Sequence, residues 1–305
     1  MSAFWDTWRK EIIRGATLFC GVLAIGFFVH YVAVSAKHAV STTLPAVLRD
    51  LPKDLGADVG DEGARVRTTG TTWTVHHKMG PKQWVWIRDL RGTITVEPTR
   101  GDSLRVTAVK TYRSSDTARV RLMATPYEGG IAVCAIWPGN EETCAPGKGF
   151  HGGRTHGNDV AVDFTVKLPA RVALGASTQV GDLHVTGASG PLLLATVSGD
   201  VRAETARGPV EAVSVNGSVH ALVRALGDTG RVSVTTVNGS VTAELPQHLD
   251  ADVEANTING SIFTDYPLTV EGKFTSHSLK GRVGQGGHEV HIQTVNGSIT
   301  LKKAN

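Results

Sequence analysis

The chain has 305 residues, of which 19% are charged, and its net charge is only +3, with no strongly basic half. This balance excludes the basic surface that a nucleic-acid partner requires. Glycine is abundant, with 35 residues, whereas aromatic residues and methionine are scarce. Frequent glycine, valine and threonine are typical of short strands joined by tight turns, so composition predicts a β-rich protein.

The first predicted element is a transmembrane helix over residues 15–36. This segment, GATLFCGVLAIGFFVHYVAVSA, has 22 residues without a charged side chain, between Arg14 and Lys37. A helix of that length extends about 33 Å, enough to span a hydrocarbon layer of ~30 Å. Basic residues in the leading segment 1–14 favour a cytoplasmic N-terminus, with the rest of the chain on the far side. A cleaved signal peptide ending at Ala36 is the alternative.

The next two predicted regions are a linker over residues 37–63 and a β-rich capping region over residues 64–168. The linker mixes proline, glycine and charge. The capping region contains runs of alternating apolar and polar residues, such as 83–88 and 158–166, which is the pattern of a strand with one buried face. We expect it to cover the first coil of the repeats that follow, because an open end would expose strand edges.

Internal repetition dominates residues 169–305. A short motif recurs there: Ser or Thr, any residue, often Asn, then Gly, a small or polar residue and an apolar residue, with the glycines 16 to 22 residues apart. Asn-Gly favours the positive φ angles of tight turns, so the motif predicts a chain corner. The expected corner residues are Gly181, Gly199, Asn216, Gly217, Asn238, Gly239, Asn259, Gly260, Gly281, Asn296 and Gly297. Leu90–Ile94 is interpreted as an early copy.

The repeats predict an all-β fold, and more specifically a β-solenoid of the parallel β-helix type. In a solenoid each repeat is one coil, and equivalent residues stack about 4.8 Å apart in ladders. The alternative is an antiparallel meander, in which each Asn-Gly forms a two-residue hairpin turn. We favour the solenoid because ladders require identical residues at identical positions and a meander does not. Lys302 and Lys303 are expected to discourage strand pairing at the C-terminal end.

Cys134 and Cys144 are the candidate disulfide. They bracket a loop between strand-like flanks, and outside the cytoplasm such a pair is expected to be oxidised. A metal site formed with His151 and His156 is the competing interpretation, but the spacing matches no standard zinc pattern. We therefore predict a disulfide, no metal site and no cofactor.

Asp182 and Asp200 are the candidate catalytic pair, because they lie one repeat apart and polysaccharide-cleaving β-solenoids use grouped carboxylates. The same position is serine in later copies, which favours a small turn-forming residue over catalysis. The chain also has no G-x-S-x-G, H-E-x-x-H or P-loop motif. The sequence therefore predicts a protein that is not an enzyme, without catalytic residues.

The T-V-N-G-S-V copies, preceded by W-V-W-I-R-D-L-R-G-T-I-T-V and N-D-V-A-V-D-F-T-V-K-L-P-A, resemble the bacterial "putative adhesin" family, a domain of unknown function built from β repeats. The resemblance covers about residues 83 to 303. It implies a bacterial envelope protein with a β-solenoid fold and an adhesive or scaffolding role. The family has no established catalytic residues to carry over.

Together these observations predict a single-pass protein of the bacterial cytoplasmic membrane, with its β domain outside. Its expected function is non-catalytic: a scaffold for adhesion, or for interaction with envelope proteins or cell-surface polymers. The alternatives are a polysaccharide-active β-helix enzyme and an accessory component of envelope sensing.

Overall fold

The computed structural model describes residues 68–115, 117–138, 144–146, 158–227, 230–270 and 275–304. Strands dominate these residues, and their one helix is the 3-10 turn Thr117–Arg119, so the all-β prediction is confirmed. The predicted N-terminal segment 1–14, transmembrane helix 15–36 and linker 37–63 lie outside the described residues. Within the described part of the chain, no helix is long and apolar enough to cross a bilayer.

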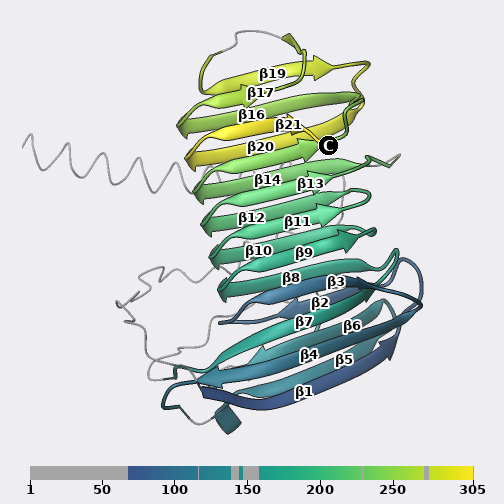
Figure 1. The fold of residues 1–305 in the computed structure, drawn as a ribbon, viewed down its shortest axis with the longest axis vertical. Coiled ribbons are helices and arrows are strands. Elements are labelled where there is room, and N and C mark those ends of the chain that lie inside the picture. The colour runs from purple at the N-terminus through teal and green to yellow at the C-terminus, as the bar shows by residue number, and fades with distance from the viewer. Residues whose placement is uncertain are drawn as a thin grey trace, which may run out of the picture. The chain divides into compact units, whose positions relative to one another are not determined.

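The strands form two sheets, which we name sheet A and sheet B (Figure 1). Sheet A has ten strands in this order: β1 (Thr68–Lys78), β4 (Ser103–Tyr112), β7 (Ala161–Pro169), β3 (Ile94–Thr99), β9 (Leu183–Ala188), β11 (Val201–Thr205), β13 (Val219–Val223), β15 (Val241–Leu245), β21 (Ile299–Lys303) and β17 (Ile262–Thr264). Sheet B has eleven strands in this order: β18 (Thr269–Val270), β19 (Ser278–Val283), β16 (Ala251–Asn259), β20 (His288–Asn296), β14 (Arg231–Asn238), β12 (Val210–Asn216), β10 (Leu192–Ser198), β8 (Ala173–Val180), β2 (Trp84–Arg88), β6 (Gly130–Ile136) and β5 (Arg121–Tyr127).

Each repeat is one coil that runs along a strand of sheet B, turns at the glycine corner and continues along a strand of sheet A. Coils β8–β9, β10–β11, β12–β13 and β14–β15 stack in sequence order, and their strands pair in parallel. Equivalent residues face one another, as Leu174, Leu192 and Val210 do. Parallel pairing of these coils is the geometry of stacked turns and not of an antiparallel meander.

The core lies between the two sheets and follows from the alternation of side chains along each strand. Strands β13 and β15 both show the pattern of buried residues at every second position. Ala203, Ala221 and Ala243 occupy one inward row of sheet A and are fully buried. Small residues in one row and larger ones in the next let the two faces pack closely.

The N-terminal strands extend the same two sheets and close one end of the stack. Coil β2–β3 lies directly beside coil β8–β9, and β6 and β7 pair with its other side. Strand β4 then pairs with β7, β1 with β4, and β5 with β6, all antiparallel. Antiparallel strands are therefore the outermost ones at this end.

The C-terminal coil is not at the end of the stack. Coil β20–β21 lies between β14–β15 and β16–β17, so the last strands of the chain separate two coils that precede them in sequence (Figure 1, yellow between green). The antiparallel hairpin β18–β19 covers the sheet B side of β16. Lys302 and Lys303 thus lie in an interior strand, β21, and our prediction that they protect a sheet edge is wrong.

Candidate functional site

The Ser or Thr of the motif is a buried hydrogen-bond donor at every corner. Each hydroxyl donates to the carbonyl oxygen of the corner glycine in a neighbouring coil, over 2.7–3.4 Å. The donors, all buried, are Thr178, Thr196, Ser214, Thr236, Thr257 and Thr294. A buried carbonyl that lacks a partner costs about 1–3 kcal/mol, so this column stabilises the stack. We call it the hydroxyl column.

The corner glycines are required by space more than by backbone angle. A Cβ at any of the six stacked corner glycines would lie only 1.9–2.1 Å from the neighbouring glycine's carbonyl oxygen. Gly181, Gly199, Gly217 and Gly297 have φ between 148° and 155°, whereas Gly239 and Gly260 do not have a positive φ in this range. None of the corner asparagines has a positive φ. Close approach between coils, not the turn angle predicted from Asn-Gly, is the property that all six share.

The corner asparagines form a continuous ladder on the exposed side of the corner. Asn238 Nδ2 donates to Asn216 Oδ1 over 2.8 Å, Asn296 Nδ2 to Asn238 Oδ1 over 2.7 Å, and Asn259 Nδ2 to Asn296 Oδ1 over 2.7 Å. The ladder order is therefore 216, 238, 296, 259, which follows the inserted position of the last coil. All three bonds run in the same direction: Asn238 and Asn296 each donate through Nδ2 and accept through Oδ1, whereas Asn216 accepts and Asn259 donates within the ladder.

The residue after each corner glycine caps the next coil. Asp182 Oδ1 accepts from the N–H of Asp200 over 2.8 Å, and Asp200 Oδ1 accepts from the N–H of Ser218 over 2.7 Å. At the same position in later coils, Ser218, Ser240 and Ser298 accept the equivalent backbone N–H through Oγ, over 3.3–3.4 Å. Asp182 and Asp200 do lie one coil apart, but their oxygens bind backbone amides within the stack.

Gly281 is not a corner residue, which corrects our assignment. It lies inside strand β19 and pairs antiparallel with Val253 and Val270. This copy differs from the later stacked corners in carrying long charged side chains, Lys280 and Arg282, on both sides of the glycine. On the edge hairpin both side chains are exposed, and Arg282 pairs with Asp252 of β16 over 2.9 Å.

The early copy around Gly92 does belong to the stack. Gly92 N–H donates to Val180 O, and Gly181 approaches the Gly92 carbonyl as the later corners approach one another. Asp89 then stands where the later coils have the hydroxyl column. It is fully buried, its Oδ1 accepts from Leu90 N–H, and its Oδ2 has no hydrogen-bond partner. Burial, assisted by the nearby Asp163, raises the pKa of Asp89 well above its usual value.

The comparison with known families matches the region that contains this repeated corner. The model of the Toastrack DUF4097 family matches residues 163–302. This segment is therefore similar to Toastrack domains. The match confirms the resemblance of the repeats to an adhesin-like domain of unknown function. No curated protein matches the chain.

Solved structures similar to this chain come from several bacteria. One, titled "putative cell adhesion protein", from Clostridium sporogenes ATCC 15579, has 12% identity and a TM-score of 0.46, and the match covers 77% of this chain and 100% of that one. Another, titled "putative adhesin", from Bacteroides fragilis NCTC 9343, has 9% identity and a TM-score of 0.37, with coverage of 76% and 97%.

Cys134 and Cys144 form a disulfide on the outer face of sheet B, beside the first coils, with their Cα atoms 5.8 Å apart. Both cysteines pack in a small apolar cluster around Trp86. His151 and His156, considered as metal ligands with them, lie outside the described residues. The described part of the chain contains no group of three or more His, Cys, Asp or Glu side chains that could hold a metal.

Trp84 and Trp86 are residues to which the sequence analysis assigned no role. Their rings stack with centroids 5.1 Å apart on the outer face of sheet B, and Trp86 Nε1 donates to Tyr127 Oη over 3.0 Å. Burial raises the pKa of Tyr127. Gly175 makes room for this cluster, because a Cβ there would lie 2.3 Å from the Trp86 ring. Two tryptophans at alternate positions of one strand were the available signal, since such residues share a face.

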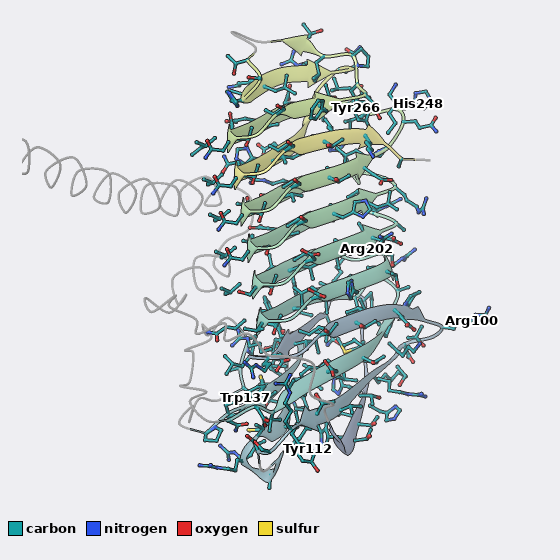
Figure 2. All side chains as sticks on the ribbon, turned by 60° about the vertical axis from the view of Figure 1, so that its left-hand side comes forward. Arg100, Tyr112, Trp137, Arg202, His248 and Tyr266 are labelled. Carbon is teal, nitrogen blue, oxygen red and sulfur yellow. A yellow bond between two sulfur atoms is a disulfide. The ribbon has the colours of Figure 1, made fainter. Side chains whose placement is uncertain are left out.

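The outer face of sheet A carries a row of side chains that differ from coil to coil. His184, Arg202 and His220 are direct neighbours across β9, β11 and β13, and the row continues along the sheet through Thr242, Thr300 and Phe263. We call it the sheet A row. The three basic side chains face carboxylates: His184 lies 4.0 Å from Asp182, Arg202 2.7 Å from Glu204, and His220 2.9 Å from Glu244. Arg202 is labelled in Figure 2, and Phe263 is 57% exposed.

The outer face of sheet B carries a more enclosed polar cluster. Burial raises the pKa of Glu211 to about 7, against the opposing charge of Arg231. Burial lowers the pKa of His291, although Glu254, 3.7 Å away, favours its protonation. The His291 ring contacts the Gln293 amide over 2.6 Å. No motif in the sequence indicated this cluster, because its members come from separate strands that only the parallel register brings together.

Proposed function

We propose that this protein is a non-catalytic scaffold of the bacterial envelope, and that its β domain presents the sheet A row to envelope proteins or cell-surface polymers. The proposal rests on a difference within each coil between the residues that repeat and the residues that vary. The residues that repeat form the hydroxyl column, the close contacts between glycines, the asparagine ladder and the caps made by the residue after each glycine. The residues that vary face solvent, as a recognition surface requires.

The candidate catalytic pair supports the same proposal. The Asp182 and Asp200 carboxylates accept backbone hydrogen bonds from the next coil, so a structural role accounts for both. We expect substitution of both by asparagine to leave the turnover of cell-wall glycans unchanged. A loss of glycan cleavage in cells that carry the double variant would overturn the scaffold proposal in favour of an enzyme.

Recognition by the sheet A row is tested with a photo-crosslinking amino acid in the full-length protein in intact bacterial cells. Placed at Arg202, it should yield a discrete crosslinked protein or polymer, because that side chain is half exposed within the row. The matched control carries the crosslinker at Glu289, which is exposed on sheet B. Equal products from both positions, or none from Arg202, would contradict the assignment of the row as the contact surface.

We further propose that residues 15–36 anchor the protein in the cytoplasmic membrane, with the β domain outside. The support is the uncharged, 22-residue apolar segment and the basic residues before it. The full-length protein should remain with the membrane after alkaline extraction, and deletion of residues 15–36 should release it. Protease added to spheroplasts should digest the β domain, and protection of the domain would reverse the proposed orientation.

A further inference from the structure

Four Asn-Gly pairs occupy chemically similar positions in the stack. They begin at Asn216, Asn238, Asn259 and Asn296, and each is preceded by Val or Ile and followed by Ser. In an Asn-Gly pair the backbone nitrogen of the glycine can attack the asparagine side-chain amide, because glycine offers no side chain to obstruct the approach. The reaction requires that nitrogen to lose its proton and the chain to rotate. Local structure therefore decides which pair reacts.

Three of the four pairs are held by the next coil. Gly217 N–H donates to Asn238 O, Gly239 N–H to Asn296 O and Gly297 N–H to Asn259 O, each over 2.9 Å. In these coils the attacking nitrogen is a hydrogen-bond donor inside the stack. Attack requires this bond to break and the neighbouring coil to separate, which is a local unfolding event.

The fourth pair, Asn259-Gly260, lies in β16–β17, the outermost of the described coils. The segment before β19 lies against its corner, where Thr257 N–H donates to His277 O and Ile262 N–H to Ser276 O. Within the described residues the structure gives the Gly260 N–H no acceptor, whereas the Gly260 carbonyl contacts His277 Nδ1 at 2.8 Å. Asn259 is exposed, and the hydrogen bond that its side chain makes among the described residues is the one from Nδ2 to Asn296 Oδ1. Neighbouring Ile258 is 62% exposed.

We propose that Asn259 is a site of spontaneous deamidation, selected among the four Asn-Gly pairs by its position at the end of the stack. The Gly260 nitrogen gives up its proton to solvent base and attacks Asn259 Cγ, which forms a new C–N bond. The Nδ2 group leaves as ammonia, and a five-membered succinimide remains. Water then opens either carbonyl of that ring, and the product is aspartate or isoaspartate at position 259.

The product changes the asparagine ladder at its exposed end. The donor that Asn259 Nδ2 supplies to Asn296 Oδ1 is lost, and a carboxylate faces that oxygen instead. An isoaspartate also lengthens the backbone by one carbon. The corner of coil β16–β17 can accept this extra length because the Gly260 N–H has no acceptor among the described residues, so no backbone hydrogen bond at that nitrogen has to break. The reaction thus adds a negative charge at the outermost coil and weakens the attachment of coil β16–β17 to coil β20–β21.

The test is peptide mass spectrometry of the folded full-length protein after incubation at mildly alkaline pH and 37 °C. Deamidation at Asn259 should be at least about tenfold faster than at the other three sites, since each of those must first break a buried backbone hydrogen bond. The unfolded chain in urea is the matched control, because the four sites share nearly the same sequence there and should react at similar rates. Asn259→Gln should remove the fast reaction and leave the three slow ones unchanged.

Equal rates at the four sites in the folded protein would overturn the proposal. A faster reaction at position 216, 238 or 296 would overturn it too. If Asn259 were also the fastest site in the unfolded chain, local sequence and not stacking would be the cause, and the structural selection inferred here would be wrong.

Discussion

At the residue scale, the fold depends on one hydroxyl per coil. Thr236 Oγ1 donates to Gly217 O over 2.7 Å in a fully buried corner. Thr236→Val keeps the shape of the side chain but leaves that carbonyl without this donor, so the free energy of unfolding should fall by about 1–3 kcal/mol. Urea denaturation measures it. The control is Thr242→Val on the outer face of β15, where a change within about 0.5 kcal/mol is expected.

The close contacts of the corner glycines lead to a second prediction at this scale, on the stability of a glycine-to-alanine variant. In Gly217→Ala the new Cβ would lie 2.0 Å from Gly199 O, a backbone atom that cannot move without separating two coils. The expected loss of stability is at least about 2 kcal/mol, typical of severe overpacking. Gly80→Ala is the control, because its Cβ would meet only the flexible Gln83 side chain at 3.5 Å. Similar midpoints for both variants in thermal unfolding would contradict this account.

The buried carboxyl of Asp89 leads us to predict that the free energy of unfolding depends on pH. Burial raises the pKa of this carboxyl in the folded protein above its unfolded value, so the folded state binds the proton more tightly. Its contribution to stability is present at low pH and decreases as pH rises from about 4. Asp89→Asn should therefore stabilise the protein at pH 8, by about 1–3 kcal/mol, and change it little near pH 4. A variant less stable than the parent at pH 8 would show that Asp89 is held as the charged form.

At the element scale, the Cys134–Cys144 disulfide fixes the segment after β6 to the Trp86 cluster. Closing a loop of this size stabilises a fold by about 2–3 kcal/mol in the chain-entropy model. Replacement of both cysteines by alanine should lower the unfolding midpoint and remove its sensitivity to a reducing agent. Unchanged sensitivity to reductant in the double variant would show that another thiol is responsible.

Much of the element level could be predicted from sequence, because period-two alternation and the repeated corner define where strands begin and end. The Cys134–Cys144 pairing could be anticipated as well. The order of the coils could not, because the corners at Asn216, Asn238, Asn259 and Asn296 carry nearly the same residues and any of them could stack on any other. The cluster around Trp86 and the polar cluster around Glu211 were not predicted either, since only the register between paired strands brings their members together.

At the scale of the whole molecule, coil β20–β21 is interior although it is last in sequence. Its backbone amides should exchange with solvent as slowly as those of β12, and more slowly than those of the edge hairpin β18–β19, because outer strands open first. Hydrogen exchange with peptide mass spectrometry measures this order. Faster exchange in β20 than in β19 would show that the C-terminal coil frays and is not clamped by its two neighbours.

The clamped position of β20–β21 also constrains how the chain is made. While the protein is being synthesised, β14–β15 and β16–β17 emerge before the coil that separates them, so each waits with an open edge on the side where β20–β21 will lie. In a nascent chain that pauses at this stage, these two open edges can pair with the edges of neighbouring chains. They can also pair with each other in the wrong register. Removal of β21 should therefore lower the yield of folded protein more than removal of an equal length from the hairpin β18–β19, since coil β20–β21 is the one that joins the two open edges.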